Sequence, residues 1–141
     1  MIPTTPPGPI SGARRRLEDD LATLDAALAR FATATQHKST WGIAATLAAK
    51  GIVLVRLGRY EEGLSVCDDV VRRYGDQSDP PTLVLVAGAM LQRAIVLTAL
   101  GRHAESEACL DGLLARFGSA AGGPDLEELV AAARRLRTPD D

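Results

Sequence analysis

The side chains that could do chemistry in this chain of 141 residues are two cysteines, two histidines and pairs of neighbouring acids. A catalytic thiol needs a nearby base, and a metal site needs several ligands at close spacing. Cys67 and Cys109 have no such base beside them in the sequence, and His37 and His103 have no acidic cluster at ligand spacing. The sequence therefore predicts neither a thiol enzyme nor a metal site.

Two pairs of neighbouring acids, Asp19-Asp20 and Asp68-Asp69, have the residue type that general acid–base catalysis uses. Both pairs lie in segments with helical periodicity, where such acids face solvent or form ion pairs. The sequence also lacks a glycine-rich phosphate loop, a Ser-His-Asp set and a nucleophile elbow. We therefore predict that this protein is not an enzyme and requires no cofactor.

The charge of the chain argues against nucleic acid as a partner. The 16 basic and 18 acidic residues give a formal net charge of −2, whereas nucleic-acid binding calls for a basic face. The run Arg14-Arg15-Arg16 could form a basic arm. Arg16 has counterparts at Arg59 and Arg102 in the repeat described below, however, which indicates the solvated start of a helix.

Three further features predict a cytoplasmic protein without a membrane span. The most apolar segment, residues 83–100, carries Gln92 and Arg93 at its middle. The arginine alone would cost about 2.5 to 3.5 kcal/mol at the centre of a bilayer. The N-terminus has no apolar run of signal-peptide length. The two cysteines lie far apart and make no disulfide framework, so we expect a reducing compartment.

The elements that position these residues follow an internal repeat with a period of 43 residues. A shift of 43 places residues 57–59 on residues 100–102, and ten of the 24 positions in 52–75 are identical at this shift. Residues 13–34 obey the same shift. A fixed period between about 20 and 50 residues is typical of a solenoid, in which each unit buries its apolar face against a neighbour.

Apolar side chains at spacings of three and four residues predict an all-α fold with about six helices. Glycines and prolines mark the helix ends. The predicted helices are residues 13–34, 40–57, 59–74, 82–100, 102–117 and 125–137. Residues 1–12, which are rich in proline, are predicted to form a disordered leader, and residues 138–141 a tail.

The repeat divides a single domain, residues 13–137, into units. Residues 13–34 form a partial unit that has only a second helix. The full units are 40–75 and 82–118, and residues 125–137 form a capping helix that carries more charge than the earlier first helices.

The units resemble the tetratricopeptide repeat family, whose pattern W-x2-L-G-x2-Y, A-x3-F and P lies on two antiparallel helices. The resemblance covers residues 14–118. The positions of the pattern hold Leu47, Lys50, Gly51, Leu54, Gly63, Cys67 and Gly75 in the first full unit, and Met90, Arg93, Ala94, Leu97, Ser106, Leu110 and Gly118 in the second. The small residues among them suit a close helix crossing. The resemblance implies a right-handed α-α superhelix.

The units also depart from that family. Their period of 43 exceeds the family's 34 residues, and Lys50 and Arg93 occupy a position that is usually leucine. The aromatic positions are aliphatic. Helical repeats of the HEAT or armadillo type have periods of about 40 to 47 and remain an alternative.

The resemblance implies a concave groove lined by the first helix of each unit, which binds a peptide or a partner helix. At the matching positions, the groove residues are Ala45, Ala48, Ala49, Ile52, Val55 and Arg56, with Gly88, Leu91, Gln92, Ile95, Thr98 and Ala99. These positions lack the lysines and asparagines with which co-chaperones of the family clamp a carboxylate. The apolar wall favours an amphipathic helix or apolar peptide of a partner protein.

Two other functions fit the same sequence. The apolar groove could pair with a second copy in a homodimer, or continue a longer structural array. The chain could also be a regulatory repeat domain of a larger bacterial signalling protein, with the proline-rich leader as linker.

Two structural expectations follow from the repeat. Gly58 and Gly101 should close the hairpins with positive φ angles. Asp25, Lys50, Asp68, Arg93 and Asp111 should lie at one height along the helices and form a structural ladder of alternating charges, because a buried cation needs a partner.

Overall fold

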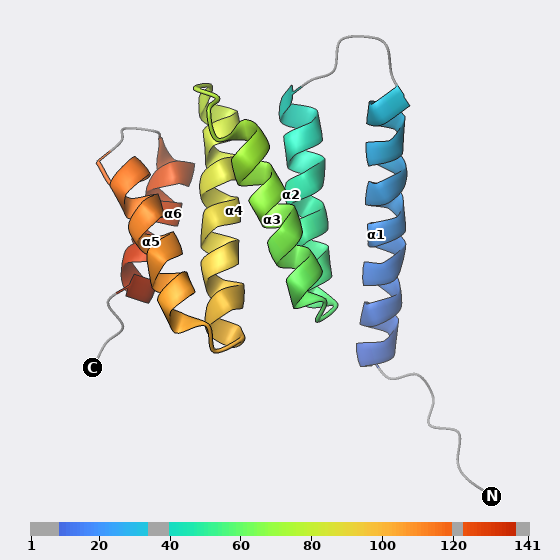
Figure 1. Ribbon diagram of the computed structural model, residues 1–141. Coiled ribbons are helices and arrows are strands. Elements are labelled where there is room, and N and C mark those ends of the chain that lie inside the picture. The colour runs from blue at the N-terminus through green and yellow to red at the C-terminus, as the bar shows by residue number, and fades with distance from the viewer. Residues whose placement is uncertain (1–8, 34–39, 120–122, 138–141) are drawn as a thin grey trace, which may run out of the picture.

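The computed structural model describes residues 9–33, 40–119 and 123–137. These ranges form six α-helices and contain no β-strand, which confirms the all-α class (Figure 1). The helices are α1 (Pro9–Thr33), α2 (Thr40–Arg56), α3 (Tyr60–Tyr74), α4 (Pro80–Ala99), α5 (His103–Phe117) and α6 (Pro124–Arg137).

Three helices begin earlier than the sequence predicts, and each begins at a proline. The helix α6 begins at Pro124, one residue before its predicted start. The helix α1 includes residues 9–12, which the sequence analysis assigned to the leader. The helix α4 begins at Pro80, after Asp79 accepts a hydrogen bond from the amide of Thr82 at 3.2 Å. Proline is tolerated in a first turn because the amide it lacks would have no intrahelical acceptor there. The rest of the leader, residues 1–8, and the predicted tail, 138–141, lie outside the described residues.

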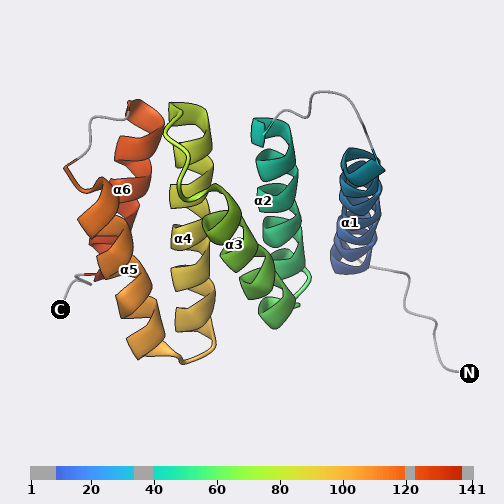
Figure 2. The same cartoon turned by 45° about the horizontal axis from the view of Figure 1, so that its top comes forward.

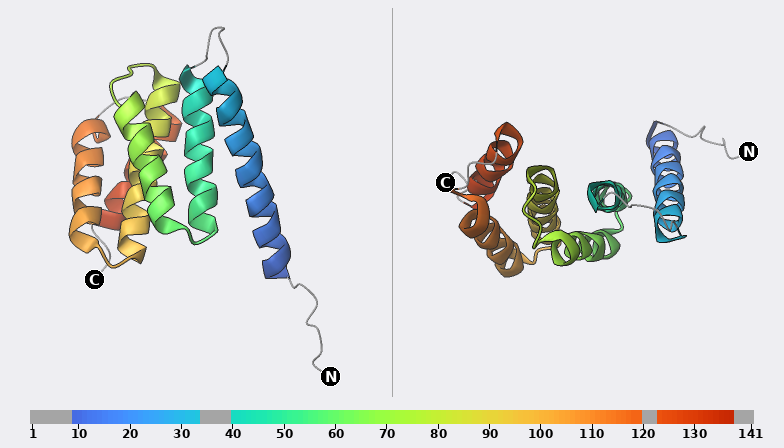
Figure 3. Two further views of the ribbon diagram at one scale, coloured as in Figure 1. Left: turned by 45° about the vertical axis from the view of Figure 1, so that its right-hand side comes forward. Right: turned by 90° about the horizontal axis from the view of Figure 1, so that it is seen from above.

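The helices pack in two rows, which are visible in the view from above (Figure 3). The inner row consists of α2, α4 and α6, because α4 contacts both α2 and α6. The outer row holds α3, which lies against α2 and α4, and α5, which lies against α4 and α6. The helix α1 packs on α2. Successive helices alternate in direction, so the three inner helices run the same way (Figure 2).

The repeat is visible in the core. Leu54 and Leu97, at the same position of the two full units, are 1% and 0% exposed. Val70 and Leu113, likewise 43 residues apart, are both fully buried. The core is thus built twice from the same positions, and apolar burial of this extent is the main favourable term in folding.

Both predicted glycine turns are confirmed. Gly58 and Gly101 have φ angles of +79° and +78°. In each turn the amide of the following arginine donates to a carbonyl five residues earlier: Arg59 to Leu54 at 2.9 Å, and Arg102 to Leu97 at 2.8 Å. This pattern is a Schellman motif, which satisfies the last carbonyls of a helix and requires a left-handed residue.

Arginines also bind the far ends of the outer helices. Arg116 on α5 donates to the carbonyl of Gly75, at the end of α3. Arg134 on α6 donates to the carbonyl of Gly118, at the end of α5, at 2.8 Å. A cation at a helix C-terminus pairs with free carbonyls and with the negative end of the helix dipole. Each unit therefore completes the helix end of the unit before it.

The helix α4 is long and apolar enough to cross a membrane by length and composition alone. In the structure it lies against α2, α3, α5 and α6, and Val86, Ala87 and Leu97 are fully buried. Its apolar character is accounted for by its central place in the fold.

Candidate partner-binding groove

A hollow of about 310 Å³ lies between α2 and α4, with α3 beneath it. It is lined by Leu47, Ala48, Ile52, Val66, Cys67, Val70, Val84, Leu85, Gly88, Ala89, Leu91, Gln92 and Leu129. None of these side chains carries a charge at neutral pH, because the pKa of the Cys67 thiol is raised to about 11 by its burial. The hollow is therefore an apolar surface on the inner row.

The structure brings together five of the predicted groove residues. Ala48 and Ile52 on α2 face Gly88, Leu91 and Gln92 on α4 across the hollow. Ile52 is 44% exposed although it is a large apolar residue.

Ile95, which lies 43 residues after Ile52, is 42% exposed on α4. Two equivalent isoleucines therefore leave apolar surface in contact with water at the same position of both units. Of the other predicted positions, Ala45 and Ala49 are half-buried, and Arg56 and Ala99 are exposed.

Two predicted groove residues face elsewhere. Val55 points to α3: a Cβ atom built on Gly63 would lie 2.8 Å from its Cγ2. Thr98, the equivalent of Val55, contacts the hydroxyl of Ser106 on α5 at 2.7 Å. Both side chains contact the hairpin partner, because a residue three positions after Ile52 or Ile95 lies about 60° around the helix.

The helix α6 forms a further wall of the groove, a role that the sequence analysis missed. Asp125, Glu128, Leu129, Ala132 and Arg135 line a second hollow of about 470 Å³, with Val84 and Leu91 of α4 on its other side. The spacing of these α6 residues, three, one, three and three, places them on one helix face. That spacing was the available signal, but the sequence analysis treated α6 only as a cap.

Trp41 marks the N-terminal end of the same surface. It is 49% exposed at the start of α2 and lines a third hollow of about 370 Å³ with Pro80, Val84 and Asp125. The three hollows share Val84, Leu85, Leu91, Leu129 and Asp125 between them. We refer to their combined lining on α2, α4 and α6 as the inner groove.

The charge ladder lies on the other side of the inner helices. Lys50 Nζ is 2.8 Å from Asp25 Oδ1, and Arg93 Nε is 2.6 Å from Asp68 Oδ1. In both pairs a cation of an inner helix meets an acid of the preceding helix. The Arg93 contact is an ion pair without hydrogen-bond geometry at Nε.

The end of the ladder differs from the prediction. Asp111 does not pair with Arg93 but with Arg137 on α6, at 2.7 Å between its Oδ1 and Nε. Arg137 lies 44 residues after Arg93, so a search at the period of 43 misses it. The structure therefore contains three separate pairs in place of one continuous row, and each joins one helix to the next inner helix.

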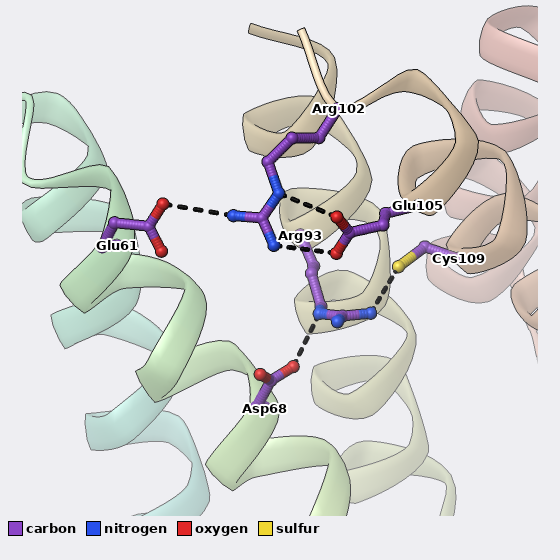
Figure 4. Close-up of polar contacts among 6 residues, drawn as sticks. All are labelled: Glu61, Asp68, Arg93, Arg102, Glu105 and Cys109. Carbon is purple, nitrogen blue, oxygen red and sulfur yellow. Dashed lines mark hydrogen bonds and ion pairs between the residues drawn. The ribbon is translucent and has the colours of Figure 1, made fainter. Parts of the chain in front are cut away.

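The polar contacts around Arg93 include one of the two cysteines (Figure 4). Arg93 Nη1 donates to Cys109 Sγ at 2.6 Å. Burial raises the pKa of the Cys109 thiol despite the opposing effect of this guanidinium. Both Cys67 and Cys109 are free thiols, and their raised pKa values keep them protonated at neutral pH, a state that is a poor nucleophile.

A second arginine joins the units at the hairpin turns (Figure 4). Arg102 binds Glu105 through two bonds, of 2.9 Å and 2.8 Å, and reaches Glu61 of the preceding unit at 3.1 Å. The bond from Arg102 lowers the pKa of the Glu105 carboxyl. Arg59 and Glu62 repeat the paired arrangement one unit earlier. These contacts connect units and do not face the inner groove.

Within the described ranges, no group of three His, Cys, Asp or Glu side chains could hold a metal ion. The chain matches no protein-family model, and no curated protein or solved structure was found to match it. Among the described residues, the inner groove is therefore the feature that points to a function.

Proposed function

We propose that this protein is a non-enzymatic interaction module, a tetratricopeptide-like α-α superhelix that holds an amphipathic helix of a partner protein in the inner groove. The observation that carries this proposal is the pair Ile52 and Ile95, which are 44% and 42% exposed at equivalent positions. Full burial of an isoleucine side chain contributes about 1.5 to 3 kcal/mol, and a partner can supply the part of this free energy that these half-exposed side chains lack. An apolar helix face laid in a groove is one of the common ways to do so.

The surroundings of Ile52 support the same proposal. The small side chains of Ala48 and Gly88 leave the hollow between α2 and α4 open. No heavy atom of the described residues lies within 4 Å of where a Cβ on Gly88 would stand, so no described part of the chain covers that part of the surface. A large apolar side chain of a partner fits this space. The free, buried thiols suit the cytoplasm, where we place the protein.

The test is binding of a synthetic amphipathic helix of about 20 residues, roughly 30 Å long, with leucines on one face. Binding is followed through the fluorescence of Trp41, the only tryptophan of the chain. The variants Ile52→Glu and Ile95→Glu should each weaken binding at least tenfold, since each removes the burial of an isoleucine and desolvates a charge.

Tyr60→Glu is the matched control, because Tyr60 is 37% exposed on the outer row. It should bind like the unmodified protein, and circular dichroism should show all three variants folded. Equal binding by the isoleucine variants and the control would exclude the inner groove as the site. A light-scattering mass of two chains, reduced to one by Ile52→Glu, would instead assign the groove to a second copy.

A further inference from the structure

Charge is distributed unequally along the α6 wall of the inner groove. Asp125 and Glu128 line it near the N-terminal end of α6, and Arg135 lines it in the last turns. None of the three makes an ion pair with a described residue, whereas Arg137, on the same helix, binds Asp111 and Glu107. Among the described residues, the groove therefore has two acids without an ion-pair partner at one end and one such cation at the other.

The direction of the helices turns this distribution into a polarity of the whole groove. The three inner helices run in the same direction (Figure 1). Asp125 lies with Trp41 and Pro80, the starts of α2 and α4, around one hollow. The acidic end of the groove is thus the N-terminal end of all three inner helices.

The fold itself accounts for only one of these acids. Asp125 lies in the first turn of α6, where an acid stabilises the positive end of the helix dipole. Glu128 lies one turn further on, beyond the range of that effect, and points to the groove with Leu129 and Ala132. Its neighbour Glu127 does not line any of the three hollows that form the inner groove.

A partner helix carries the complementary charges when it runs opposite to α4. Helices favour acids in the first turn and bases in the last turn. We propose that the inner groove binds its partner helix antiparallel to α4, with the basic C-terminal turn of that helix beside Asp125 and Glu128 and its acidic first turn beside Arg135. This inference rests on the proposed function and adds the charge pattern and the direction of the bound helix.

The test uses a shorter amphipathic peptide of about 14 residues, the length of α6, with glutamates in its first turn and lysines in its last, because Arg135 lies only ten residues after Asp125 along α6. One version carries a fluorescence quencher at the C-terminus, the other at the N-terminus. Trp41 lies at the acidic end of the groove, so the C-terminal quencher should reduce its emission and the N-terminal quencher should not. We expect roughly a tenfold excess of the antiparallel orientation, since a few exposed pairs contribute up to about a factor of five each. High salt should reduce it.

The double variant Asp125→Asn/Glu128→Gln should lose most of this orientation preference, and Glu127→Gln is its matched control. Binding with equal quenching from both ends, or with stronger quenching from the N-terminal end, would overturn the inference and leave the proposed function intact. Absence of binding by either peptide would overturn the proposed function as well. A mass of two chains for the protein alone would replace both with self-association.

Discussion

Where α2 crosses α3, Gly51 and Gly63 face each other, and where α4 crosses α5 the same two positions hold Ala94 and Ser106. In the first hairpin a Cβ on Gly63 would lie 3.5 Å from the carbonyl oxygen of Gly51. In the second, the Ser106 hydroxyl donates to the carbonyl of Ala94 at 2.8 Å.

The two turns nevertheless have nearly the same backbone. The residues before α3 and α5, Arg59 and Arg102, have φ and ψ of −90° and 67° in one hairpin and −90° and 66° in the other. The comparison shows that the turn and the apolar core set the hairpin geometry. At the crossing, the two helices can be in contact either through the backbone of two glycines or through a hydrogen bond from a serine.

The largest loss of stability should follow from placing a side chain where α2 crosses α3, since both residues there are glycine. Gly63→Ala places a Cβ 2.8 Å from Val55 Cγ2, too close for either atom to stay in place. We expect a loss of about 1 to 3 kcal/mol in the free energy of unfolding, measured by urea denaturation. Gly112→Ala is the control, because its Cβ would meet only Met90 Cε at 3.7 Å. Adding Val55→Ala should recover part of the loss, and no recovery would show that the side-chain clash is not the cause.

Substitution of the turn glycine should destabilise the protein equally in both hairpins. Gly58→Ala and Gly101→Ala each force a side chain into a positive φ angle, at a cost of about 1 to 2 kcal/mol. Gly12→Ala, in α1 with no atom of the described residues within 4 Å of the new Cβ, should stabilise the protein slightly. Unequal losses at the two turns would contradict the view that they are equivalent.

The hydrogen bond of the second crossing should contribute less. Ser106→Ala removes the bonds of its hydroxyl to the Ala94 carbonyl and to Thr98, and we expect a loss of about 1 kcal/mol. The thermal unfolding of this variant is compared with that of Ser106→Gly, which has the residue of the first hairpin. The difference between the two variants measures the contribution of the Cβ, and the loss in Ser106→Ala measures that of the bond. A Ser106→Ala variant as stable as the original would mean that the bond contributes nothing.

The charge pairs between units should contribute least among these contacts. Lys50 and Arg93 are 27% and 32% exposed in their side chains, and their acids about half exposed. Solvent screening limits each pair to less than about 1 kcal/mol. Double-mutant cycles with Asp25→Asn and Asp68→Asn should give a larger coupling for Arg93 only if its contact with Cys109 holds the guanidinium in place. Coupling energies unaffected by salt would contradict this account.

The stability that Asp79 contributes at the start of α4 should depend on pH. The bonds from Thr82 lower the pKa of the Asp79 carboxyl. A carboxyl whose pKa is lower in the folded state than in the unfolded state stabilises the fold at pH values above its ordinary pKa of about 4. This stabilisation is lost as the pH falls through the folded-state pKa. The melting temperature of Asp79→Ala should therefore lie below that of the unmodified protein at pH 7. The difference should shrink in acid, and a constant difference would exclude the cap as its source.

The sequence correctly predicts the features that recur at the period of 43 residues. The turns at Gly58 and Gly101 and the cations opposite Asp25 and Asp68 appear twice, so each copy supports the other. The predictions failed where the repeat changes length or where helix rotation decides. Arg137 was missed because the link before α6 shifts the register by one residue.

Helix rotation explains the remaining differences. The resemblance to tetratricopeptide repeats implies a groove position for Val55, but in the structure its side chain turns toward Gly63. The groove role of Glu128 depends on how α6 packs across α4, which periodicity alone does not fix. A pattern of apolar residues shows which face of a helix is buried. It does not fix the rotation of the helix closely enough to place each side chain of a site.

The position of α1 at the edge of the structure has a dynamic consequence. Among the described helices, it packs only on α2, over the small cluster of Leu21, Val53, Leu54 and Leu57. A helix with a single neighbour can separate from the rest without breaking any other interface, so its opening costs only a fraction of the free energy of global unfolding. Each such opening uncovers Val53 and Leu57, and the outer side of α2 becomes briefly available to solvent while the inner groove stays intact.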